Sequence, residues 1–98
     1  MRAVAQSADS ATLLKQRTLA LWVAQNRLAA AQFATPWPPL GARDGDAVQA
    51  GARFLWHENV AGTPNPSFRK IEITVTLPGA ADYALARIVG YVGQPPQR

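Results

Sequence analysis

The sequence predicts an α+β domain in which one long N-terminal helix packs on a small antiparallel sheet. Three observations lead to this fold class. Residues 4–34 are rich in helix-forming residues and contain no glycine or proline. Residues 52–60, 68–77 and 85–92 alternate apolar and polar side chains, as half-buried strands do. Turn-forming residues separate these segments, and a helix followed by a strand meander makes a two-layer fold.

The length and composition fit a single globular domain spanning residues 1–98. Hydrophobic residues make up 48% and charged residues 16% of the chain, which is atypical of disorder. The chain has no cysteine, so disulfides and thiolate metal sites are excluded. No apolar run reaches the roughly 18 residues of a membrane-spanning helix. The predicted parts are a helix (1–34), a loop (35–51), a β-meander (52–92) and a tail (93–98).

The predicted helix carries more apolar surface than one sheet requires. At about 100° per residue, two apolar lines run along it, roughly a quarter turn apart. A helix packed on one sheet needs a single apolar stripe, so we expect another protein to cover the second line. The first line holds Leu14, Leu21 and Leu28, flanked by Leu13, Ala20, Ala24 and Ala31. The second holds Ala11, Trp22, Ala29 and Phe33, while Asp9, Gln16 and Arg27 are expected to form a solvated strip.

Periodicity does not decide which line meets the sheet, so the predicted partner-binding face takes residues from both. Small residues such as Ala11 and Ala29 allow a neighbouring helix to approach closely, and Trp22 is a typical interface anchor. In the alternative, the loop after the helix folds back and buries the Trp22 line within the monomer. The predicted partner-binding residues are Ala11, Leu14, Thr18, Leu21, Trp22, Gln25, Leu28 and Ala29.

The segment 35–51 is predicted to be a loop because it contains three prolines and three glycines. Thr35 precedes Pro36 and is therefore pushed out of the helical region, which ends the helix. Trp37 lies between prolines and is expected to act as a hydrophobic plug against the core. Asn26 is expected either to bond a neighbouring subunit or to satisfy a backbone group of this loop.

The three predicted strands differ in the clarity of their pattern. In 68–77, alternate aliphatic residues are expected to face the helix: Ile71, Ile73, Val75 and Leu77. In 52–60, Phe54, Trp56 and Glu58 share one face, and Leu55, His57 and Asn59 share the other. In 85–92, Gly90 marks either a bulge or a close approach of the helix. Pro95 and Pro96 end the pairing, and the tail is expected to fray.

Few residues point to catalysis, metal binding or nucleic-acid binding. His57 is the one histidine, and a lone strand histidine lacks the partners of a zinc site. Asp44 and Asp46 supply only two carboxylates, so a plain turn is favoured over a calcium loop. The serines lack a nucleophile motif, and the positive charges, net +4, are scattered. We therefore predict no enzyme activity, no metal, no cofactor and no nucleic-acid partner.

The order of these features resembles the type IV pilin-like proteins. More narrowly, it resembles minor pseudopilin I (the GspI family) of bacterial type II secretion systems. The resemblance extends over nearly the whole chain. It is carried by Arg17–Asn26 in the helix, Trp37-Pro38, Gly51–Trp56, Arg69–Val75 and Ala86–Tyr91.

The resemblance implies a structural role. It implies partners in the J-type and K-type minor pseudopilins and in the major pseudopilin. Together these form a tip complex that initiates the pseudopilus and helps to export folded proteins across the outer membrane. It also implies a periplasmic domain anchored in the inner membrane by a methylated hydrophobic segment, absent from this sequence. Alternatives are a minor pilin of a related fibre system, or a small ligand-binding module that uses exposed Trp37 and Trp56.

Overall fold

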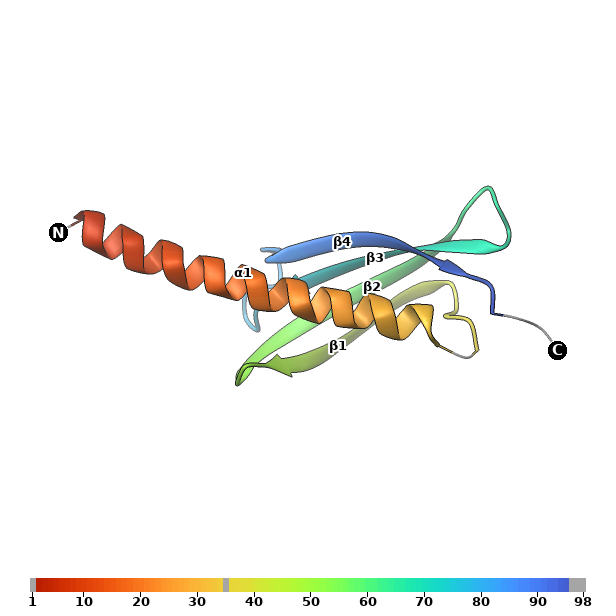
Figure 1. The fold of residues 1–98 in the computed structure, drawn as a ribbon, viewed down its shortest axis with the longest axis horizontal. Helices are drawn as coiled ribbons and strands as arrows, with labels where there is room; N and C mark the ends of the chain where they lie inside the picture. Colours follow the sequence, from red (N-terminus) through yellow and green to blue (C-terminus); the bar gives the residue numbers. More distant parts are fainter. Residues whose placement is uncertain (1, 35, 96–98) are drawn as a thin grey trace.

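A long helix lies across one face of a four-stranded antiparallel sheet in the computed structural model, which describes residues 2–34 and 36–95 (Figure 1). The sheet order is β1-β2-β3-β4, so each strand pairs with its neighbour in sequence. The predicted α+β class is confirmed. The predicted helix end at Thr35 lies outside the described residues. The predicted frayed tail, 93–98, is wrong at its start, because Gly93 belongs to β4 and the Gln94 N–H donates to the Ser67 carbonyl at 2.8 Å, and residues 96–98 lie outside the described residues. The elements are α1 (Arg2–Gln32), β1 (Gly41–Gln49), β2 (Ala52–Gly62), β3 (Phe68–Thr76) and β4 (Ala86–Gly93).

The prediction of a loop over residues 35–51 is wrong for its second half, which forms strand β1. β1 pairs with β2 along its whole length, from Gly41 opposite Val60 to Gln49 opposite Ala52. The hairpin turn has positive φ at both Ala50 (52°) and Gly51 (78°), as a two-residue type I′ turn requires. β1 is an edge strand, where residues of low strand propensity are tolerated because β2 supplies its ladder partner.

The core lies between α1 and the inner face of the sheet. Ile71, Ile73 and Val75 of β3 are fully buried there, as predicted, and β3 ends before Leu77. On the helix, Ala20 and Ala24 are also fully buried. Their short side chains allow the helix to lie close to the strands, as small residues at a packing contact do.

Gly90 of β4 allows a close approach between α1 and the sheet. A Cβ atom at this position would lie 2.7 Å from Cδ1 of Leu28, well inside van der Waals contact. Of the two alternatives for this glycine, the close approach of the helix is therefore correct. Leu28 consequently packs against the sheet and is half-buried.

Trp37 closes the end of the core below the helix, as predicted. Its side chain is half-buried, and its indole N–H donates a hydrogen bond to the Val92 carbonyl at 3.3 Å. The Arg69 guanidinium lies 3.9 Å from the centre of the Trp37 ring and donates to the Pro38 carbonyl at 2.5 Å. These contacts hold the connection between α1 and β1 against β3 and β4.

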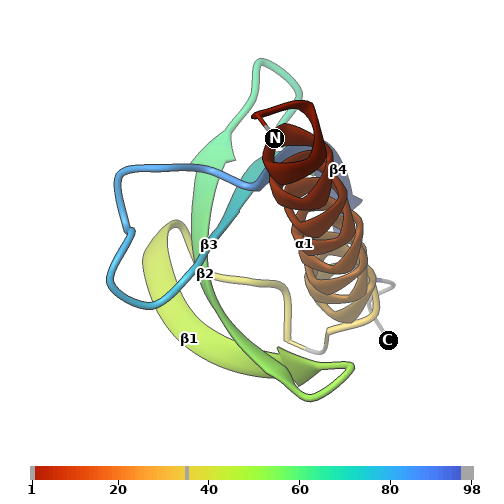
Figure 2. The ribbon, with the colours of Figure 1, turned by 90° about the vertical axis from the view of Figure 1, so that its left-hand side faces the viewer.

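The molecule is elongated, with principal extents of 63 × 26 × 19 Å. Viewed end-on, α1 lies over the half of the sheet that contains β4, while β1 lies farther away (Figure 2). The N-terminal part of α1 extends beyond the sheet (Figure 1). Among the described residues, no helix has the length and apolar character needed to cross a membrane.

Candidate partner interface

The side of α1 that points away from the sheet is exposed and largely apolar. Leu14 is 66%, Leu21 38% and Trp22 49% exposed, although all three are large hydrophobic residues. All three belong to the side of α1 that is not buried against the sheet. We call this surface the outward face and define it by its exposed residues: Ala11, Leu14, Thr18, Leu21, Trp22, Gln25 and Ala29.

The loop after the helix does not cover the outward face. Trp37 packs toward Val92 and Arg69 on the other side of α1, and Phe33 remains 86% exposed. Trp22 and its line therefore stay uncovered by the rest of the described chain. This geometry removes the alternative in which the monomer buries the Trp22 line, and it leaves partner binding as a prediction.

Two helix residues lie elsewhere than the sequence predicted. Leu28 was included in the partner-binding set, but its contact with the sheet at Gly90 places it at the border of the monomer core. Arg27 was expected in a solvated strip, and this expectation is wrong, because Arg27 turns toward β2. Gln16 is half-buried, and the side chain of Asp9 lies outside the described part.

Glu58 of β2 explains the position of Arg27. Its carboxylate is buried and accepts a hydrogen bond from Arg27 Nε at 2.5 Å and another from Arg43 at 2.9 Å. A buried carboxylate requires such partners, since an unpaired charge in the core is strongly unfavourable. The cluster therefore joins α1, β1 and β2. An acidic residue on the apolar face of a predicted strand was the available sequence signal.

A hollow of about 460 Å³ lies on the outward face near the middle of α1. Its lining includes the short side chains of Ala11 and Thr18 and the larger ones of Leu14 and Trp22. The Thr18 hydroxyl donates a hydrogen bond to the Leu14 carbonyl at 3.0 Å, one turn earlier in the helix. Thr18 thus presents no unpaired donor to the hollow.

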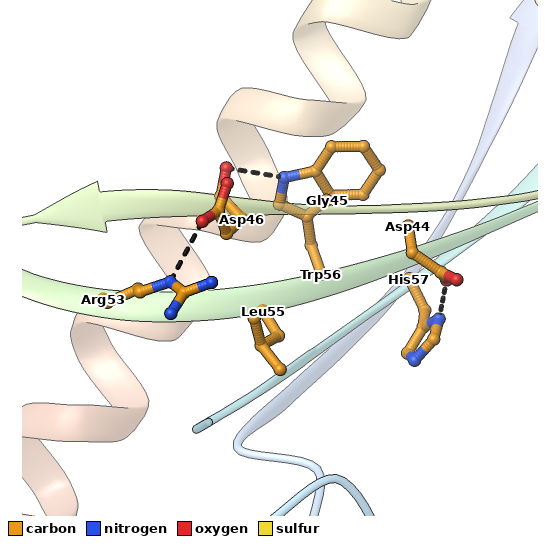
Figure 3. A pocket seen from close by; sticks show the side chains of 7 residues that line it. All are labelled: Asp44, Gly45, Asp46, Arg53, Leu55, Trp56 and His57. Atoms are coloured by element: carbon orange, nitrogen blue, oxygen red, sulfur yellow. Dashed lines mark hydrogen bonds and ion pairs between the residues drawn. The ribbon is translucent and has the colours of Figure 1, made fainter. Parts of the chain in front are cut away.

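A second hollow, of about 510 Å³, lies at the β1–β2 edge of the sheet (Figure 3). Asp44 pairs with His57, and Arg53 Nε lies 3.0 Å from Asp46 Oδ2. Asp44 and Asp46 lie within strand β1, so the expected turn is wrong. All four side chains are more than half exposed. Within the described ranges, no three metal-ligating side chains gather here or elsewhere.

Trp56 borders this second hollow, but its ring is already in contact with the protein. The Arg27 guanidinium lies 3.8 Å from the ring centre, and Gly45 of β1 lies against the ring. The indole N–H donates to the Asp46 carbonyl at 3.3 Å (Figure 3). Stacking of a sugar or peptide on Trp56 would have to displace these contacts. The geometry therefore disfavours the ligand-binding alternative.

Asn26 lies on the exposed side of α1. Within residues 2–34 and 36–95, its side chain makes no hydrogen bond. The alternative in which Asn26 satisfies the loop is therefore not seen. Its hydrogen bond to a neighbouring subunit stays a prediction.

Comparison with known proteins identifies relatives along nearly the whole chain. A family profile described as "Type II secretion system (T2SS), protein I" matches residues 14–93. Type II secretion system protein I of Pseudomonas aeruginosa is 31% identical over 103 residues, covering 98% of this chain and 80% of that protein. The protein of the same name from Dickeya chrysanthemi is 30% identical, covering 97% of this chain and 76% of that protein.

The fold is also similar to that of a chain in a solved structure. The crystal structure of the GspK-GspI-GspJ complex from the enterotoxigenic Escherichia coli type 2 secretion system contains it. The TM-score is 0.70 at 24% sequence identity, and the match covers 84% of this chain and 98% of that chain. At this identity the similarity supports the fold.

Proposed function

This chain belongs to the type II secretion system protein I family, and we propose that it is a minor pseudopilin that acts by binding other subunits. In this role it forms part of a complex at the tip of the pseudopilus, initiates fibre assembly and helps to export folded proteins. The family match over residues 14–93 supports this proposal.

The observation that carries the proposal is the exposed apolar outward face of α1. Leu14, Leu21 and Trp22 leave a continuous apolar strip in water, and such strips mark interaction sites when they are contiguous. An assembly protein needs such a surface to bind a neighbouring subunit. The match to the type II secretion system protein I family supports a non-enzymatic role.

We propose a J-type minor pseudopilin as the partner on the outward face, with a K-type minor pseudopilin in the same complex. The solved structure that this fold matches is a complex of GspK, GspI and GspJ, which supports this choice. We also propose that the domain works in the periplasm and is held at the inner membrane. Fractionation of cells that produce the full-length protein tests this location.

The experiment that tests the function measures binding to the soluble domain of the J-type pseudopilin from the same operon. A pull-down followed by calorimetry should show one-to-one binding with Kd below about 1 μM, a typical value for a specific complex. Trp22→Asp and Leu21→Asp should weaken it by about 100-fold or more, because both bury a charge at the proposed contact. Thermal melting should show that both variants fold.

Val89→Asp is the matched control. Val89 is 47% exposed, close to the value for Trp22, but it lies on the outer face of β4. It should leave binding unchanged. Equal loss in the control would contradict the outward face as the binding surface. No binding by folded wild-type protein would overturn the J-type partner.

A further inference from the structure

We call the hollow on the outward face the socket. It is lined by short side chains, among them Ala11 and Thr18, and by the larger side chains of Leu14 and Trp22. In helix packing, a side chain of one helix inserts among about four residues of the facing helix. Ala11, Leu14, Lys15 and Thr18, at positions i, i+3, i+4 and i+7 of α1, line the socket and have the spacing of such a set.

We propose that this hollow receives one large aliphatic side chain from a helix of the partner, and that Lys15 pairs with a carboxylate beside it. This inference rests on the proposed function, because it takes the J-type pseudopilin as the partner. It adds the residue chemistry that the partner must present.

The largely apolar lining of the socket favours an aliphatic side chain of the partner. The Thr18 hydroxyl is bonded to the Leu14 carbonyl at 3.0 Å, so burying it leaves no donor unpaired. Leu19, which is 8% exposed, borders the hollow and links it to the monomer core. An inserted side chain would therefore gain contacts with residues that are already held in place, at low entropic cost to this chain.

Lys15 is the charged residue among those that line the socket. It lines the hollow and is exposed, and no ion pair joins it to an acidic side chain of the described residues. The chain as a whole carries a net charge of +4. A partner carboxylate at this rim would be matched in charge, whereas a basic residue would be repelled.

A variant that fills the socket tests the proposal. Thr18→Leu should weaken binding of the soluble J-type domain by about tenfold or more, since overpacking a close contact is unfavourable. Thr18→Ala, which keeps the space open, should change the affinity less than about threefold. The melting temperature of both variants should match the wild type because position 18 is exposed.

The matched control is Thr12→Leu, which makes the same substitution at an exposed position of α1 outside the hollow. It should bind as the wild type does. A second variant tests the proposed ion pair between Lys15 and a partner carboxylate. Lys15→Glu should weaken binding by about fivefold or more, and the loss should shrink at high salt, because salt screens charges.

The outcomes separate this proposal from the proposed function. If wild-type protein does not bind the J-type domain, the function itself fails. If it binds and Trp22→Asp abolishes binding, but Thr18→Leu binds normally, the socket is wrong and the function stands. If Lys15→Glu binds more tightly than wild type, the partner rim is basic and the assigned carboxylate is wrong.

Discussion

At the scale of single residues, Glu58 depends on specific partners because its carboxylate is buried. Its carboxylate has no exposed area and is held by Arg27 and Arg43. We predict that Glu58→Gln lowers the free energy of unfolding by about 3 kcal/mol, because one partner of a buried ion pair is removed. Urea denaturation measures this loss.

Asp46→Asn is the control for the Glu58 prediction. It makes the same acid-to-amide change in the same sheet, but Asp46 and its partner Arg53 are both more than half exposed. It should lower the free energy of unfolding by less than about 1 kcal/mol, as exposed pairs do. Equal losses in the two variants would contradict the claim that the buried ion pairs of Glu58 stabilise the fold more than the exposed pair of Asp46.

Gly45 is a second position at which the fold restricts the choice of residue. An added Cβ would lie 2.6 Å from Cε2 of Trp56, so the indole would have to leave its place against β1. We predict that Gly45→Ala destabilises the protein by about 1–3 kcal/mol through overpacking. At Gly62, in the same sheet, an added Cβ meets nothing within 4 Å, so Gly62→Ala should cost less than about 0.5 kcal/mol. Similar midpoints of thermal unfolding for the two variants would refute this reading.

The sequence predicted some of these residues and missed the roles of others. The alternation of apolar residues was enough to place Ile71, Ile73 and Val75 in the core. The same alternation put Glu58 on the inner face, but it carried no information on which cations would meet it. Arg27 and Arg43 are distant in sequence from Glu58, and only the packing of three elements brings them together.

At the scale of elements, helix α1 was predictable because its signal is local and long. β1 was not, because its polar residues and two glycines give no alternating pattern. Pairing with β2 stabilises it, and Trp56 contributes from the neighbouring strand by bonding the Asp46 carbonyl. Strand propensity depends on such tertiary context, so the sequence alone favoured a loop.

The two edge strands share one structural device. In each, an indole N–H bonds a backbone carbonyl: Trp56 with Asp46 in β1, and Trp37 with Val92 in β4. In each, an arginine lies over the indole ring. Edge strands with free backbone groups are sites of unwanted pairing. These contacts occupy one backbone carbonyl of each edge strand.

Two alanines of α1, one on its buried side and one on its outward face, allow a matched prediction. Ala24 is fully buried against the sheet, whereas Ala29 is exposed on the outward face. Ala24→Leu should destabilise the monomer by about 1–3 kcal/mol, and Ala29→Leu should change its stability by less than about 0.5 kcal/mol. Thermal melting of the two variants compares them directly. A larger loss at position 29 would mean that the helix presents its other side to the sheet.

At the scale of the whole molecule, we propose that the fold separates stability from assembly. The inner side of α1 packs on β3 and β4 and completes the core. Glu58 of β2 pairs with Arg27 of α1. The outward side keeps Leu14 and Trp22 in solvent, although their burial would stabilise a monomer. The N-terminal part of the helix extends beyond the sheet (Figure 1), so the outward face is open along much of its length.

The central claim is that the outward face of α1 binds the partner. Site-specific photo-crosslinking tests it most directly, with a benzophenone amino acid placed at exposed Gln25 or, as control, at exposed Val89 on the outer face of the sheet. The soluble J-type domain is then added and irradiated. We predict a strong crosslink from position 25 and little from position 89. A crosslink from position 89 with none from position 25 would contradict the account.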